Sequence, residues 1–114
     1  MGYTVDDLAA TLAASTEENY VRVVADWLVN GDLSDNEPAL AGTPVVDALT
    51  AATVAHLARS RALNPPRWTF APTRALPSFW HPGSDRFFAY ALAHTPSEFL
   101  SRGVIIEQDS LVSV

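Results

Sequence analysis

Hydrophobic positions in the first third of the chain repeat with the period of an α-helix. One helix face with the spacing i, i+3, i+4, i+7, i+8 is formed by Tyr20, Val23, Val24, Trp27 and Leu28. The S-x-x-E segment from Ser15 to Glu18 has the form of a capping box, which satisfies free backbone N–H groups at a helix start. Gly31 stands where a left-handed residue would end the helix. The pattern therefore predicts a helix that begins in this box and ends at Gly31.

Two more helices are predicted in the first half of the chain. The first runs over residues 5–14, with Thr4 as its N-cap and two acids in its first turn. A longer helix begins at Pro44, which follows a threonine N-cap, and runs to Leu63. Because apolar residues occupy more than one of its faces, this helix should be the central, buried one. Residues 31–44 lack periodicity and are expected to form a loop.

The segment after the long helix is rich in proline and aromatic residues. Residues 64–84 hold five of the eight prolines, together with two Trp and two Phe. An extended segment that packs against the core as it crosses is expected here. Residues 67–70 have the composition of a short strand, as do residues 104–106, so one minor two-stranded pairing of these segments is predicted.

Two short helices are predicted near the C-terminus. Ser84 is the expected N-cap of the first, which continues through Phe87 and ends near His94. The second opens with the capping box Thr95 to Glu98 and ends at Gly103, for which a positive φ is expected. A last turn follows at residues 109–112. Residues 1–114 are thus predicted to form a single, mainly α domain of about five helices.

Length and composition agree with one small domain. A chain of 114 residues is the size of one hydrophobic core, and 48% hydrophobic residues supply enough apolar area to fold. The chain contains no Cys, which fits a reducing compartment. The N-terminal segment does not resemble a secretion signal, and no apolar window approaches the length of a membrane span. We therefore expect a cytoplasmic protein with no membrane association.

The charge is distributed unevenly. Residues 1–58 hold nine acids and one base, whereas residues 59–114 hold six arginines and four acids. A pI of about 4.7 argues against nucleic acid as the partner, because neutralising phosphates requires a basic face. A local arginine patch stays open as an alternative to arginines that cap helices or pair with the acidic half.

Residues that could carry chemistry are few. The imidazoles His56, His81 and His94 do not have metal-ligand spacing, and we interpret His56 as a hydrogen-bonded core residue. No G-x-S-x-G nucleophile elbow and no glycine-rich phosphate loop is present. We therefore expect no catalytic residue, no metal site and no cofactor.

Two groups of residues are candidates for binding a partner. Trp68, Phe79 and Trp80 lie between arginines in a segment that is not helical in pattern, and aromatic residues with arginine dominate the binding energy of known interfaces. An acidic surface would attract a basic partner and raise its association rate. The predicted partner-binding residues are Trp68, Phe79, Trp80, Arg67, Arg74, Asp32, Asp35 and Glu37. The three acids are otherwise read as a solvated loop, since they lack the spacing of a calcium loop.

Residues 20–112 also resemble a domain family. The residues that carry the resemblance are Val23 to Leu28, Asp47 to Leu49, Ala55 to Ala58, Pro66 to Thr69, Phe79 with Trp80, and the closing run Thr95 to Ile106. In this order they are similar to an uncharacterised family common in actinobacteria, whose ending is S-P-x-x-F-x-x-R-G-[IV]-hydrophobic-[IV]. Members often follow a helix-turn-helix and neighbour nucleotidyltransferase-like toxins, so the resemblance implies an antitoxin-like or regulatory role. About twenty residues precede the match here, too few for a helix-turn-helix, so DNA binding is not carried over.

The sequence therefore favours a non-enzymatic protein-interaction module, antitoxin-like or regulatory, with a protein partner. The alternative is a small ligand-binding or regulatory homodimer. An enzyme with no recognisable motif ranks third.

Overall fold

The computed structural model describes residues 3–82 and 88–111. Its α-helices are α1 (Val5–Ala14), α2 (Glu17–Asn30), α3 (Pro44–Ser60), α4 (Phe88–His94) and α5 (Ser97–Leu100), joined by the 3₁₀ helices η1 (Arg67–Phe70), η2 (Pro72–Arg74) and η4 (Gln108–Leu111). Helix accounts for 61% of the structure and strand for 4%, which confirms the mainly helical prediction. Among the described residues, no helix is long and apolar enough to cross a lipid bilayer.

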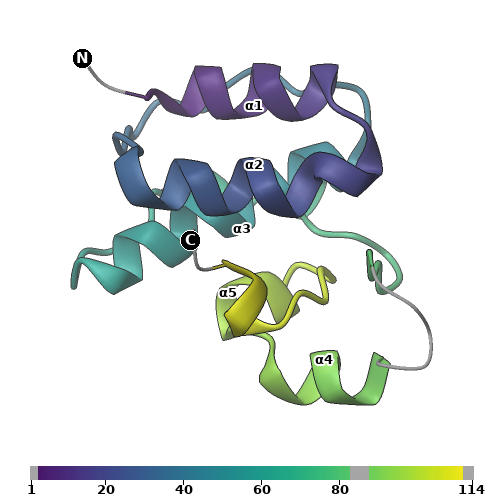
Figure 1. The fold of residues 1–114 in the computed structure, drawn as a ribbon. Helices are drawn as coiled ribbons and strands as arrows, with labels where there is room; N and C mark the ends of the chain where they lie inside the picture. The colour runs from purple at the N-terminus through teal and green to yellow at the C-terminus, as the bar shows by residue number, and fades with distance from the viewer. Residues whose placement is uncertain (1–2, 83–87, 112–114) are drawn as a thin grey trace.

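Helix α3 is the centre of the molecule, as its apolar pattern predicted. It contacts α1, α2, α5, η1 and η2, and α1 and α2 lie side by side in front of it (Figure 1). Its buried threonines Thr50 and Thr53 donate to carbonyls one turn earlier, so their hydroxyl groups are satisfied inside the core. The helix ends at Ser60 rather than Leu63, because Ala62 adopts a left-handed conformation with φ of 57°.

The capping box predicted from Ser15 does not form. Ser15 is the C-cap of α1, and its hydroxyl donates to the Thr11 carbonyl 2.7 Å away, so Ser15 ends the preceding helix rather than beginning α2. Thr16 occupies the N-cap of α2 instead. A reciprocal capping box does form one helix earlier, where Thr4 Oγ accepts from the Asp7 backbone and the Asp7 carboxylate accepts from the Thr4 backbone.

Gly31 follows α2 as predicted, but for a different reason. Its φ of −67° and ψ of 143° are extended, so the left-handed conformation expected from the sequence is wrong. A Cβ atom at this position would lie 2.5 Å from Cε2 of the fully buried Trp27. The Trp27 indole in turn donates to the carbonyls of Tyr3 and Thr4, which attaches the start of α1 to the end of α2. Glycine is therefore required for space rather than for conformation.

The predicted strand at residues 67–70 is wrong, since this segment is the 3₁₀ helix η1. Both the backbone N–H and the hydroxyl of Thr69 donate to the Pro66 carbonyl, and these local bonds replace a strand ladder. Val104 instead forms a single parallel bridge with Trp80. The extended segment after η2 is thus joined to the C-terminal segment by this bridge and by the Leu76 N–H, which donates to the Arg102 carbonyl at 2.9 Å.

The two C-terminal helices lie at the predicted positions in the sequence, but the predicted capping box does not form. Helix α4 ends at His94 as expected, while Ser84 and Phe87 lie outside the described residues. The second predicted capping box is also wrong, because Pro96 rather than Thr95 is the N-cap of α5 and no side chain caps it; the Thr95 hydroxyl donates to the Ala91 carbonyl. Gly103 has the expected positive φ, 82°. Trp27 and Phe99 are fully buried.

Candidate functional site

Arg74 and Trp68, predicted as partner-binding residues, are core side chains. Only 1% of Arg74 is exposed, and its Nε donates to Glu37 Oε2 at 3.0 Å while its Nη2 donates to the Pro38 carbonyl at 2.7 Å. Its Nη1 lies 3.4 Å from the carbonyl oxygen and 3.8 Å from a carboxylate oxygen of Asp47. The buried Trp68 ring lies 5.0 Å from the guanidinium carbon. The expectation that these two side chains are exposed anchors is therefore wrong, because convergent acceptors draw Arg74 inside.

The three acids of the loop after α2 are all exposed, but they do not have the same surroundings. The carboxylate of Glu37, 41% exposed, forms an ion pair with the buried Arg74 at 3.0 Å. Asp32 and Asp35 are exposed, and the adjacent backbone is fixed where the Ser34 carbonyl accepts from Trp68 Nε1 at 3.4 Å. Attraction of a basic partner to Asp32 and Asp35 stays a prediction.

The remaining predicted residues divide between surface and core. Phe79 is 59% exposed, and Arg67 is also exposed. Trp80 is half-buried: its ring centroid lies 6.0 Å from that of Tyr20, and its backbone bridges to Val104. Phe79 and Arg67 are thus available to a partner, whereas replacing Trp80 would also disturb packing between α2 and the C-terminal segment.

A hollowed surface surrounds Ser101, and sequence reasoning did not identify it. Three shallow pockets adjoin there, and Ser101 lines all of them. Phe70, 61% exposed, borders two of these pockets, and Phe79 borders the third. Apolar residues also line two of the pockets: Ala71 and Ala75 the second pocket beside Phe70, and Leu76, Pro77 and Leu100 the pocket beside Phe79. We refer to this surface, from Phe70 to Phe79 around Ser101, as the Ser101 face.

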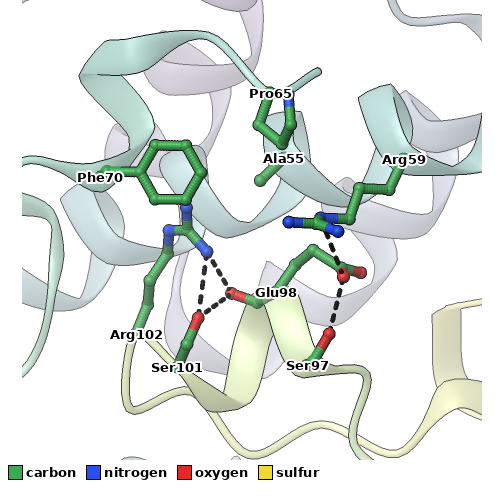
Figure 2. A pocket seen from close by; sticks show the side chains of 8 residues that line it. All are labelled: Ala55, Arg59, Pro65, Phe70, Ser97, Glu98, Ser101 and Arg102. Carbon is green, nitrogen blue, oxygen red and sulfur yellow. Dashed lines mark hydrogen bonds and ion pairs between the residues drawn. The ribbon is translucent and has the colours of Figure 1, made fainter. Parts of the chain in front are cut away.

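One pocket of the Ser101 face carries polar groups (Figure 2). It has a volume of about 270 Å³ and lies between α3, η1 and α5. The lining residues are Ala55 and Arg59 from α3, Pro65 and Phe70 from the following segment, and Ser97, Glu98, Ser101 and Arg102 from α5 and its end. Convergence of these elements on α3 brings together residues up to 47 positions apart, from Ala55 to Arg102, which a local pattern cannot show.

Glu98 is the acidic group of this pocket. Its Oε1 lies 2.7 Å from His56 Nδ1, and its Oε2 accepts from Ser97 Oγ at 2.8 Å and lies 3.6 Å from Arg59 Nε. Burial alone would raise the pKa of this carboxyl, but the hydrogen bonds from His56 and Ser97 and the charges of His56 and Arg59 hold the pKa below its ordinary value. Glu98 is therefore ionised at neutral pH and keeps Arg59 beside the pocket.

Arg102 is the second cation, and 5% of it is exposed. Its Nε donates to the Thr69 carbonyl at 2.9 Å, and its Nη1 donates to the Glu98 carbonyl at 2.7 Å and to Ser101 Oγ at 3.2 Å. Its Nη2 is buried and has no hydrogen-bond partner in the described structure. The Phe70 ring lies over the guanidinium, 5.2 Å from its carbon. Burial lowers the pKa of Arg102 below its ordinary value.

The chemistry that this pocket offers is recognition of an anion by cationic donors. The hydroxyls of Ser97 and Ser101 form hydrogen bonds with Glu98 and Arg102, and within the described part of the chain neither serine is hydrogen-bonded to a histidine. Among the described residues, no group of three His, Cys, Asp or Glu side chains is arranged to hold a metal ion. The sequence predicted His56 to be a core residue and Glu98 to be part of a helix cap, so the contact between these two side chains was not predicted.

Comparison of the chain with protein-family models, with curated proteins and with solved structures finds no match.

Proposed function

We propose that the chain is a protein-interaction module whose binding surface is the Ser101 face. The observation that carries this proposal is the exposure of two large aromatic side chains, Phe70 at 61% and Phe79 at 59%, at the borders of adjoining pockets. Aromatic residues that insert into a partner, with arginine nearby, supply most of the binding energy in interfaces. Arg67 lies in the same 3₁₀ helix as Phe70 and is exposed.

Of the other exposed apolar side chains, Leu63 lines a separate pocket beside Asp35, and two more lie away from the Ser101 face. Val29 is 59% exposed and Tyr90 is 50% exposed, but neither lines any of the pockets of the Ser101 face. Single exposed apolar residues are common on monomeric proteins and require no partner. The Ser101 face differs because its aromatic residues flank concave, apolar surface, which gives a partner side chain somewhere to pack.

The partner is proposed to be the other protein of a two-protein system in the cytoplasm, with this chain in an antitoxin-like or regulatory role. This part of the proposal is supported by the resemblance of residues 20–112 to a family with such gene neighbours. It is also supported by a fold without cysteine, which suits a reducing compartment.

Co-expression of the chain with the product of its neighbouring gene tests the proposal. We expect the two proteins to co-purify, and Phe79→Ser to weaken their association by at least about tenfold, measured by titration calorimetry. Phe70→Ser should have a similar effect. Val29→Ser is the matched control, because Val29 is equally exposed on α2.

The far-UV circular dichroism spectrum of each variant establishes that it folds. Association that survives both phenylalanine substitutions at full strength would reject the Ser101 face as the interface. Loss of association in Val29→Ser alone would move the interface to α2. A wild-type chain that instead forms a dimer with itself, broken by Phe79→Ser, would favour the homodimer alternative.

A further inference from the structure

The unpartnered nitrogen of Arg102 is the starting point for a second kind of binding. A buried guanidinium N–H without an acceptor costs free energy, and buried polar groups in folded proteins are nearly always paired. The other two nitrogens of Arg102 are occupied by carbonyl and hydroxyl oxygens, so only Nη2 remains for a new acceptor. This nitrogen belongs to a side chain that is 95% buried and lines the pocket of Figure 2.

Arg59 faces Arg102 across the same pocket (Figure 2). Its side chain is 59% exposed, and its Nε lies 3.6 Å from Glu98 Oε2, which positions it without burying it. The two arginines come from different elements. Arg59 lies in the last turn of α3, and Arg102 follows Ser101, the C-cap of α5. An anion placed between them would accept from Arg102, whose position is fixed by burial, and from Arg59, whose exposed side chain can adjust.

The charge balance of the pocket selects a singly charged anion. Among the lining side chains, two arginines oppose one ionised carboxylate, Glu98, which also contacts His56 at 2.7 Å, so the cations of the pocket are not fully neutralised. A dianion would lie close to Glu98 and be repelled by it. A carboxylate suits this arrangement, because one oxygen can accept from Arg102 Nη2 and the other from Arg59.

The rest of the lining suits an apolar body attached to that carboxylate. Ala55, Pro65 and Phe70 form the apolar part of the pocket. The Phe70 ring lies over the Arg102 guanidinium, and Nη2 is shielded from solvent, so the ring has to rotate for an acceptor to enter. Because Phe70 is 61% exposed, its side chain has free space into which it can turn.

We infer that this pocket binds the carboxylate of a compact apolar acid between Arg59 and Nη2 of Arg102, with Phe70 moving from the guanidinium onto the apolar body. The site shares Phe70 with the proposed protein interface, but Phe79 lines a different pocket, so substitution of Phe79 can separate the two kinds of binding. The acid is either a free small molecule or the C-terminal carboxylate of a peptide, which present the same chemical group.

Titration of the full chain with phenylacetate, followed by amide NMR shifts, tests the inference. We expect saturable shifts at residues 97–102 and at Phe70, and no binding of the neutral analogue phenylacetamide. Arg59→Gln should weaken phenylacetate binding by about tenfold, because one charge-assisted hydrogen bond is lost. Arg67→Gln is the matched control: this exposed arginine does not line the pocket, so binding should be unchanged.

A second arm of the experiment distinguishes the two sources of the carboxylate. The peptide acetyl-Gly-Phe with a free C-terminus is compared with the same peptide as its C-terminal amide. Binding of phenylacetate at least as tight as that of the peptide acid supports a free acid as ligand. Much tighter binding of the peptide acid, with none by its amide, supports a chain terminus.

Three results would overturn the inference. Equal binding of phenylacetate and phenylacetamide would show that the carboxylate is not recognised. Equal binding by wild type and Arg59→Gln would remove the cation from the site. Inorganic phosphate binding at residues 97–102 more tightly than phenylacetate would show that charge, rather than a carboxylate on an apolar body, selects the ligand. Phe79→Ser should bind phenylacetate normally, so failure of this site and failure of the protein interface can be told apart.

Discussion

Among the residues that the structure describes, two arginines are buried, and their surroundings are opposite in character. Arg74, 1% exposed, is matched by the carboxylates of Glu37 and Asp47, and each of its three nitrogens has a partner. Arg102, 5% exposed, has carbonyl and hydroxyl acceptors for two nitrogens and none for the third. Each guanidinium lies against an aromatic ring, but Trp68 beside Arg74 is buried, whereas the ring beside Arg102 is exposed.

The difference separates a structural side chain from a candidate binding group. At Arg74 the fold itself completes the hydrogen bonding, so no acceptor from outside can improve it. At Arg102 the fold leaves one donor unsatisfied beside a pocket, and the ring that lies over the guanidinium is exposed. Burial of an arginine therefore does not by itself distinguish a structural side chain from a binding group. The distinction depends on whether all of its hydrogen-bond acceptors come from the same chain.

The largest effect is expected at the satisfied arginine. Arg74→Met should lower the free energy of unfolding by about 3–5 kcal/mol, because it leaves the carboxylate of Asp47 buried without its cation. Urea denaturation measures the change. Adding Asp47→Asn to this variant should restore part of the loss, since the stranded charge is removed. An Arg74→Met variant no less stable than wild type would break the comparison.

Gly103 tests the backbone that places the unsatisfied arginine. Gly103→Val should lower the free energy of unfolding by about 2–4 kcal/mol, since φ is +82° and the added Cβ would lie 3.0 Å from Leu76 Cβ. Gly42 has the same left-handed conformation, φ +83°, with open space around it. Gly42→Val is therefore the control and should cost less. A thermal melt in which the two variants match would show that crowding at Leu76 is unimportant.

A smaller loss of stability is expected at Arg102 itself. Arg102→Met removes the donor to the buried Thr69 carbonyl but leaves no buried carboxylate behind, so a loss of about 1–3 kcal/mol is expected. The same urea experiment measures it. Equal losses in Arg102→Met and Arg74→Met would contradict the distinction between the two surroundings.

The smallest expected effect is on pH dependence. Glu98 has a folded-state pKa below its ordinary value of 4.5, so its contribution to stability is complete above pH 4.5 and is lost as pH falls through the lowered pKa. The stability difference between wild type and Glu98→Gln should be constant above pH 4.5 and shrink below it. Urea denaturation of both proteins between pH 7 and pH 3 measures this. A difference that stays constant over the whole range would show that the pKa is not lowered.

Local patterns were sufficient where neighbours in sequence decide the structure. The repeat that contains Tyr20 and Trp27 predicted α2, and Pro44 marked the start of α3, because helix periodicity and proline geometry depend on residues within a few positions. The caps were less predictable. Ser15 could end one helix or begin the next, and in the structure it is the C-cap of α1, with its hydroxyl donating to the Thr11 carbonyl.

What the sequence by itself determined is the set of helices, the central place of α3 and the positive φ of Gly103. Only the tertiary structure decided which arginine and aromatic side chains of the proline-rich half are buried and which are exposed. Glu37 is 37 positions from Arg74, and Thr69 is 33 positions from Arg102. Partners at such separations meet only when α3 brings their elements together. Hydrogen bonding and burial act on distance in space, which no spacing along the chain encodes.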